Sequence, residues 1–139
     1  MSNVPFAACR LDPAGINDGR WFTHPHGFRW RIASTRKKAY RRRLAELMEP
    51  HAAIRAAAPA SDIAKKALDE ALLTAYAEHI VTGWSGMFLT AEEELPCTVE
   101  NIRAIIADPG YEHVYDWCAT CASQDGMFAA VAEAKDAGN

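Results

Sequence analysis

The sequence predicts a mainly α-helical protein with a small N-terminal β-hairpin, an α+β fold in one domain of residues 1–139. Half of its 139 residues are hydrophobic, enough for a single core at this length. Apolar residues alternate with arginines over residues 28–32, the period of a strand. Further along, apolar residues recur at helical spacing between proline and glycine breaks. We therefore expect a β-rich region at residues 1–33 and a compact core of four to six helices over residues 34–135.

The N-terminal region is expected to be irregular apart from one hairpin. The apolar run Phe6–Leu11 ends at a turn signal in residues 12–15, and residues 17–19 form a second turn signal. Residues 20–23 then face residues 28–32 across a His-Pro-His-Gly turn. The second strand should have one apolar face and one basic face. A two-stranded hairpin is marginal alone, so it must pack on the helices.

The rest of the chain is predicted to be helical. Ser34 or Thr35 should cap the first helix, and Ser61 or Asp62 the third. The third helix should end at Gly83, which suits the left-handed position just past a helix end. The expected helices cover residues 34–49, 51–58, 61–82, 98–107, 111–123 and 126–134. The expected buried stripe of the third helix is Ile63, Leu68, Leu72, Tyr76, His79 and Ile80.

The connection after the third helix has the most distinctive sequence. Trp84 follows Gly83 at once and should be mostly buried beside the helix end. A loop from Ser85 to Glu94 carries three consecutive acids at its C-terminal end. It also carries an apolar triplet that we expect to be partly exposed as a contact surface. The residues predicted to bind a partner here are Trp84, Met87, Phe88 and Leu89.

This stretch resembles the tail assembly chaperones of long-tailed bacteriophages. The matching features are the helix into Val81, Gly83, Trp84, the loop, and then Leu95, Pro96, Thr98, Glu100, Asn101 and Ile102. The loop departs from the family pattern, with Met87-Phe88-Leu89 where a Gly-Asp type turn is expected. The resemblance implies a protein of the host bacterial cytoplasm that binds the phage tape measure protein and keeps it soluble during tail tube assembly. It also suggests the tail tube protein as a second partner.

Charge is distributed unevenly along the chain. Residues 1–43 hold ten Lys and Arg against two acids, which gives +8, while residues 44–139 hold five against sixteen, which gives −11. Such halves suit head-to-tail self-association through Arg41, Arg42 and Arg43, or they neutralise each other within one fold. A nucleic-acid-binding module using residues 29–43 is an alternative, because aromatic residues are interleaved with the cations. The strand aromatics alternate with Arg29 and Arg31, so they should face away from the basic side and make nucleic acid a less favoured partner.

Motifs for catalysis, cofactors and membranes are missing from the sequence. It has no Gly-rich phosphate loop, HExxH or GxSxG, so we expect a protein that is not an enzyme and has no cofactor. Cys118 and Cys121 form a single CxxC with no second tight ligand pair, so both should be small core residues rather than metal ligands. No apolar run is long enough to span a bilayer. A structural tail-completion or connector protein remains a further alternative.

Overall fold

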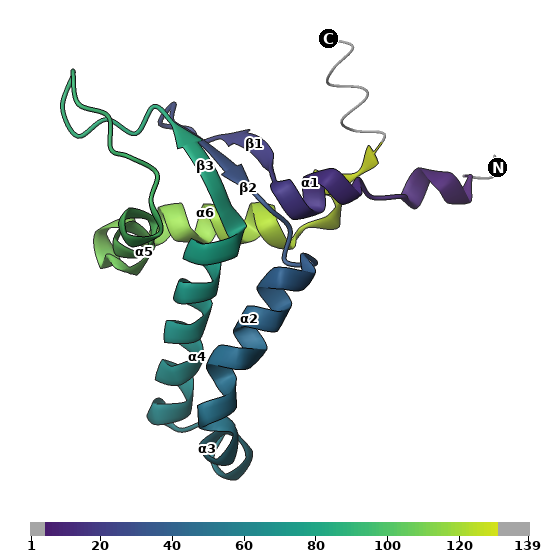
Figure 1. The fold of residues 1–139 in the computed structure, drawn as a ribbon, viewed down its shortest axis with the longest axis vertical. Helices are drawn as coiled ribbons and strands as arrows, with labels where there is room; N and C mark the ends of the chain where they lie inside the picture. Colours follow the sequence, from purple (N-terminus) through teal and green to yellow (C-terminus); the bar gives the residue numbers. More distant parts are fainter. Residues whose placement is uncertain (1–4, 131–139) are drawn as a thin grey trace.

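The computed structural model describes residues 5–130, which form a mainly helical α+β fold with one small antiparallel sheet (Figure 1). The strands are β1 (Arg20–Thr23), β2 (Arg29–Ile32) and β3 (Val81–Ser85), in the order β1-β2-β3. The predicted fold class is confirmed. So is the hairpin of β1 and β2, while the third strand was not expected from the sequence.

The helices divide into a projecting arm and a body that carries the sheet. Helices α2, α3 and α4 form the arm, and α5 and α6 lie with the sheet in the body (Figure 1). The helices are α1 (Pro13–Asp18), α2 (Lys38–Met48), α3 (Ala52–Ala57), α4 (Asp62–Ala75), α5 (Val99–Ala107) and α6 (Glu112–Ser123). A π-helical turn, η3 (Tyr76–Ile80), continues α4. Short 3-10 turns are η1 (Phe6–Cys9), η2 (Glu49–His51), η4 (Pro109–Tyr111) and η5 (Asp125–Phe128).

The prediction that a helix ends at Gly83 is wrong. The helical conformation stops at Ile80, and Val81 to Ser85 form β3. Gly83 is therefore a strand residue opposite Arg31 and does not have a positive φ. The strand forms because β2 offers a free edge whose aromatic Trp30 pairs directly with Trp84. Cross-strand pairing is a long-range contact, and no local sequence signal reports it.

Other boundaries also differ from the prediction. The two turn signals of the N-terminal region form one helix, α1, because Asp12 accepts hydrogen bonds from the backbone N–H groups of Ala14 and Gly15. Ser34 accepts a bond from the N–H of Arg36 before α2 begins, so it makes a turn instead of the predicted cap. The apolar run at Phe6 is an exposed 3-10 turn. The predicted helix 126–134 is a 3-10 turn up to Phe128, and residues 131–134 lie outside the described part.

Several predicted helix starts are confirmed by their caps. The Ser61 hydroxyl accepts from the N–H of Ala64, and the Thr98 hydroxyl accepts from the N–H of Asn101. The buried stripe of α4 is only partly as predicted. Tyr76 and Ile80 are buried, but the side chains buried along α4 itself are alanines. The buried residues of α4 are Ala64, Ala71 and Ala75, while Ile63 and Leu68 are 68% and 39% exposed.

The core lies between the inner face of the sheet and helix α6. Trp30 is fully buried, and its ring centroid lies 5.8 Å from those of both Trp84 and Trp117. Cys118 and Cys121 are buried on the inner side of α6, as predicted. Burial raises the pKa of both thiols, so they remain neutral and pack as small apolar groups.

Candidate partner-binding site

The loop between β3 and α5 is a small, ordered hairpin. The N–H of Leu95 donates to the carbonyl of Met87 at 2.6 Å, and that of Leu89 donates to the carbonyl of Glu93 at 2.8 Å. Phe88 and Glu94 form an isolated antiparallel bridge. The hairpin can turn away from β3 because Gly86 has a φ of +78°, a conformation in which a side chain would be strained. The loop therefore has a defined shape that can present side chains.

Two buried tryptophans fasten this hairpin to the body. The Trp84 indole N–H donates to the carbonyl of Leu95 at 2.8 Å. The Trp30 indole N–H points at the Met87 sulfur at 3.3 Å. Both indoles belong to the inner face of the sheet, so the hairpin is held on the side where α5 and α6 lie. Trp84 is 9% exposed, which confirms that it is mostly buried.

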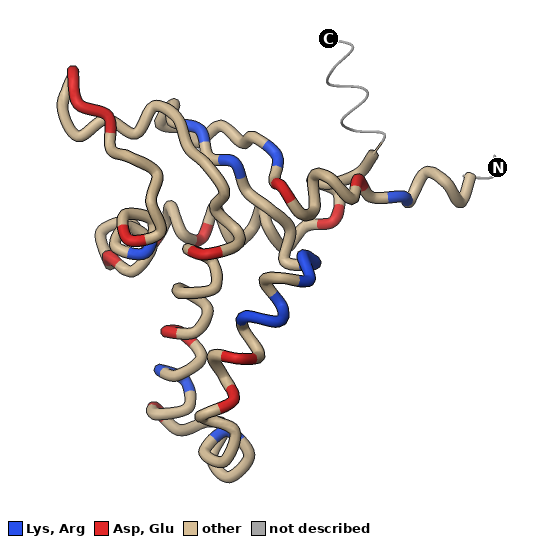
Figure 2. Tube along the Cα trace, viewed as in Figure 1, with Lys and Arg blue, Asp and Glu red and all other residues tan. Residues whose placement is uncertain are grey.

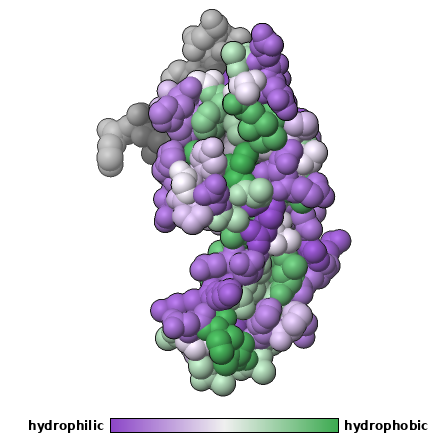
Figure 3. Space-filling model, turned by 90° about the vertical axis from the view of Figure 1, so that its left-hand side faces the viewer, coloured by the Kyte–Doolittle hydropathy of each residue, from purple (hydrophilic) through white to green (hydrophobic). Residues whose placement is uncertain are grey.

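Between the hairpin and helices α5 and α6 lies an apolar groove of about 300 Å³. Its outer lip carries Phe88 and Leu89, which are 58% and 62% exposed, as the sequence predicted for this part of the loop. The lining residues described by the structure carry no formal charge. They are Phe28, Gly86, Met87, Phe88, Leu89, Leu95, Ile105, Tyr111 and Val114. Figure 3 views the molecule from the left-hand side of Figure 1, where the loop and α5 lie, and shows hydrophobic surface in its upper half.

The structure brings together three of the predicted partner-binding residues and separates the others. Met87, Phe88 and Leu89 line the groove, whereas Trp84 is not a lining residue and supports the loop from beneath. Sequence reasoning missed the opposite wall, to which Ile105 and Val114 belong. The helical stripe of α5 marked Ile105 as apolar, but nothing in the sequence placed it against the loop.

The predicted arginine triplet lies on α2, at the start of the arm and separate from the groove. The Arg43 guanidinium makes an ion pair with Glu78, with an N–O distance of 2.6 Å, and a longer one with Glu46. The Arg41 guanidinium donates to the backbone carbonyl of Thr35 at 3.0 Å. Arg42 is exposed. At least one member of the triplet therefore joins α2 to η3, the turn that continues α4, within the same chain.

Part of the charge separation is neutralised within the fold. Arg36, from the basic half, makes a two-point contact with Asp125 from the acidic half, at 2.6 and 2.8 Å. This carboxylate raises the pKa of the Arg36 guanidinium, and the guanidinium lowers the pKa of Asp125. Figure 2 shows the remaining separation, with basic residues along α2 and β2 and acidic residues at the tip of the loop.

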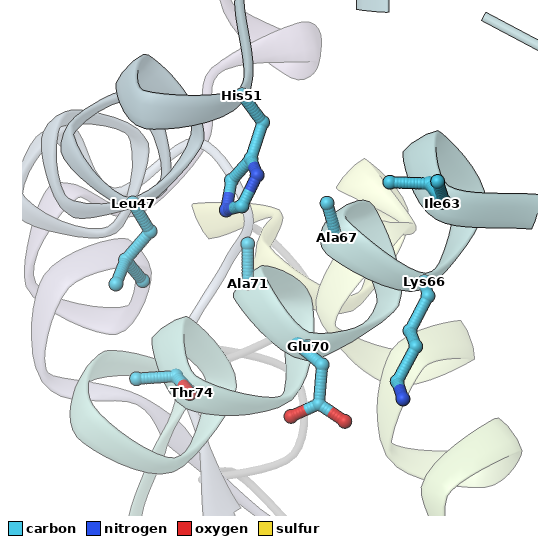
Figure 4. A pocket seen from close by; sticks show the side chains of 8 residues that line it. All are labelled: Leu47, His51, Ile63, Lys66, Ala67, Glu70, Ala71 and Thr74. Carbon is cyan, nitrogen blue, oxygen red and sulfur yellow. The ribbon is translucent and has the colours of Figure 1, made fainter. Parts of the chain in front are cut away.

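A second groove lies in the arm and was not expected from the sequence. It has a volume of about 410 Å³ and opens between α2 and α4 (Figure 4). Leu47 and His51 form one side, and the small Ala67 and Ala71 on α4 leave the space open. Ile63, at its end, is 68% exposed. The arm thus carries apolar surface of its own.

A cluster of histidines and aromatic rings lies at the β1–β2 turn. The His24 ring is 6% exposed and stacks on Phe28 at a centroid distance of 4.4 Å. Its Nδ1 accepts a hydrogen bond from the N–H of His26 at 3.1 Å. Burial, together with repulsion from His26 and His113, lowers the pKa of His24. Within residues 5–130, no group of three or more His, Cys, Asp or Glu side chains is placed to hold a metal ion.

The described helices are too short or too polar to cross a membrane. Among known families, the sequence model of one family, described as YdaY prophage protein, matches residues 35–139. No curated protein and no solved structure matches the chain. The matched region contains the arm, the loop, both walls of the apolar groove apart from Phe28, and helix α6.

Proposed function

The chain belongs to the YdaY prophage protein family, and from this premise we propose that it is a tail assembly chaperone, which binds the phage tape measure protein and keeps it soluble while the tail tube assembles. The observation that supports this role is the apolar groove beneath the loop. Most of its lining residues lie within the segment whose sequence resembles tail assembly chaperones. A binding role of this kind needs no catalytic residue.

The chemistry of the groove suits an apolar stripe on a helix. A tape measure protein is a long, mostly helical chain that exposes such stripes before the tube covers them. The groove lining has no formal charge, and Phe88 and Leu89 can close over a bound side chain from the loop. Apolar side chains inserted here would be removed from water, which prevents them from meeting another unassembled chain.

The small size of the groove implies weak binding by each copy. A volume of about 300 Å³ lies at the lower end of the ~300–1,000 Å³ that ligand pockets usually have. Many copies bound along one tape measure would together retain it, and single copies would leave readily when the tube protein arrives. Weak individual sites are therefore compatible with a transient role during assembly.

Co-expression with the tape measure protein of the same prophage tests the proposal. We expect the chain to raise the soluble fraction of the tape measure and to co-purify with it. The double variant Phe88→Ser/Leu89→Ser should lose both effects while it stays folded, because both side chains are largely exposed.

Phe6→Ser is the matched control, since Phe6 is 90% exposed on the N-terminal turn and does not line the groove. A tape measure that is equally soluble alone would contradict the proposal. So would a double variant that protects the tape measure as well as the native chain does.

A further inference from the structure

The outer face of the sheet, opposite the core, carries a basic surface. Cross-strand pairing places Trp21 beside Arg31, and Arg31 beside Gly83, on this face. Arg29 lies two residues from Arg31 and therefore on the same face, with its guanidinium carbon 5.0 Å from the centre of the Trp21 ring. Trp21 is 45% exposed. The expectation that the hairpin aromatics all face away from the arginines is thus wrong for Trp21.

The two arginines of this face differ from the arginines that make ion pairs within the molecule. Arg36, Arg43 and Arg103 all reach carboxylates within the molecule. Within residues 5–130, neither Arg29 nor Arg31 has a carboxylate within 4.0 Å. Their positive charge is available to an outside partner, and the Trp21 ring beside them gives that partner an apolar surface.

The tip of the loop carries the complementary charge. Glu92, Glu93 and Glu94 are all exposed, and the acidic tip projects from the body in Figure 2. Glu94 already accepts a hydrogen bond from the N–H of Gly86, so it helps to hold the hairpin together. The side chains of Glu92 and Glu93 have no cationic partner among the described residues.

The acidic tip projects from the body, and within residues 5–130 no ion pair joins it to the basic face of its own chain (Figure 2). The loop is fastened by Trp30 and Trp84, which belong to the inner face of the sheet. Arg29 and Arg31 lie on the outer face, with the strands between them and these fastening contacts. Because one chain keeps its basic face and its acidic loop apart, a second copy can supply the opposite charge to each of them.

We propose that Glu92 and Glu93 of one copy bind Arg29 and Arg31 of the next copy, in a head-to-tail contact. The contact is heterologous, so each added copy leaves one free loop and one free basic face, and the assembly grows as an open chain. Trp21 excludes water beside the ion pairs and strengthens them. The proposed ion pairs use none of the side chains that line the groove, so this self-association does not depend on the proposed tape measure partner.

A carboxylate loop fits this surface better than a nucleic acid does. Only two arginines of the outer face are free, and the one exposed ring is already next to a guanidinium. Strong binding of a nucleic acid needs many neutralised phosphates, and the chain has a net charge of −3, which repels a polyanion. Two neighbouring glutamates can pair with two neighbouring arginines without the repulsion that a long polyanion would meet.

Sedimentation equilibrium with two complementary variants tests the inference. The face variant is Arg29→Gln/Arg31→Gln, and the loop variant is Glu92→Gln/Glu93→Gln. At low ionic strength the native chain should form oligomers whose mean mass rises with concentration, and each variant alone should remain a monomer. An equal mixture should form dimers and nothing larger. The face variant keeps the acidic loop and the loop variant keeps the basic face, so only one contact can form between them. Salt at about 0.5 M should dissociate the native oligomers, because exposed charges are then screened within a few ångström.

Controls separate this contact from the other sites. Arg55→Gln removes an exposed arginine of α3 and should leave the oligomers unchanged. The groove variant Phe88→Ser/Leu89→Ser should also still associate. The inference is overturned if the native chain is monomeric at every concentration, if either variant still associates alone, or if the mixture stays monomeric. Binding of single-stranded RNA by a monomeric native chain, lost in the face variant, would assign the surface to nucleic acid instead.

Discussion

The indole of Trp84 stabilises the core and the loop at the same time. Its ring packs against Trp30 in the buried cluster, and its N–H donates to the carbonyl of Leu95. We expect Trp84→Ala to lower the free energy of unfolding by about 3–5 kcal/mol, the usual cost of deleting a large buried ring. Trp84→Phe keeps a ring and loses the hydrogen bond, so it should lower the free energy of unfolding by about 1–2 kcal/mol. Urea unfolding followed by circular dichroism measures both, and a loss below about 1 kcal/mol for Trp84→Ala would contradict the packing role.

His24 should make the stability of the protein depend on pH. Burial and two neighbouring histidines lower the pKa of its ring in the folded state, so folding favours the neutral form. As pH falls through about 6.5, the unfolded chain takes up the proton first. Stability should therefore fall with decreasing pH from about 6.5 until the folded pKa is passed. Protonation of Nδ1 also breaks the bond from the His26 N–H.

The variant His24→Asn should reduce this pH dependence. An asparagine can accept the same local hydrogen bond and does not titrate. Thermal melts at pH 7.5 and 5.5 measure the difference. His79→Gln is the necessary companion variant, because burial also lowers the pKa of His79 and shifts stability in the same direction. A native chain that is equally stable at both pH values would disprove the role of both histidines.

At the scale of secondary structure, local signals predicted the helices well and the third strand not at all. Thr98 and Ser61 start helices as predicted, because a cap is an interaction within four residues. Gly83 and Trp84 were assigned to a helix end, whereas they pair with residues more than 50 positions earlier. Such pairing depends on where the hairpin packs, which local propensity does not contain.

Alanine substitutions at two glycines test whether Gly83 has the strand conformation of the structure or the helix-end conformation predicted from the sequence. A Cβ on Gly83 would lie 3.6 Å from Arg31 and 3.7 Å from Trp21, ordinary contacts, and its φ is not positive. Gly83→Ala should therefore change the free energy of unfolding by less than about 1 kcal/mol. Gly19→Ala is the contrasting variant, with a φ of +94° and a Cβ only 2.8 Å from the Thr82 hydroxyl. Gly19→Ala should lower the free energy of unfolding by more than about 1 kcal/mol. A costly Gly83→Ala in urea unfolding would favour the helix-end conformation.

The candidate site was predictable on one side only. Met87, Phe88 and Leu89 stand out in the sequence as an apolar triplet in a polar loop, and the structure places them at the groove. The wall formed by Ile105 and Val114 consists of ordinary helical core residues, which become a site only because α5 and α6 leave a gap below the loop. The arm groove was not foreseen for a related reason: alanines at its base look like plain helix formers.

For the whole molecule, the main hydrophobic core reaches only the body-proximal end of α4. Tyr76, Ile80 and Ala75 belong to the main core, together with residues of α6 and the sheet. Toward the start of α4, Ile63 is 68% exposed. Over the same stretch the groove separates α4 from α2. The body-proximal end of α4 should therefore be more stable against local opening than the distal end.

Hydrogen exchange along α4 measures this gradient. Amides near Ala75 should exchange only when the whole domain unfolds, and amides near Lys66 should exchange through openings of the arm tip at a much lower free energy. Helix α6 is the internal control, because Val114, Cys118 and Cys121 are buried along its length and should give more even protection. Filling the groove with Ala67→Leu should slow exchange at the tip by packing α4 against Leu47. Equal protection from Ile63 to Ala75 in the native chain would show instead that the arm opens as one unit with the body.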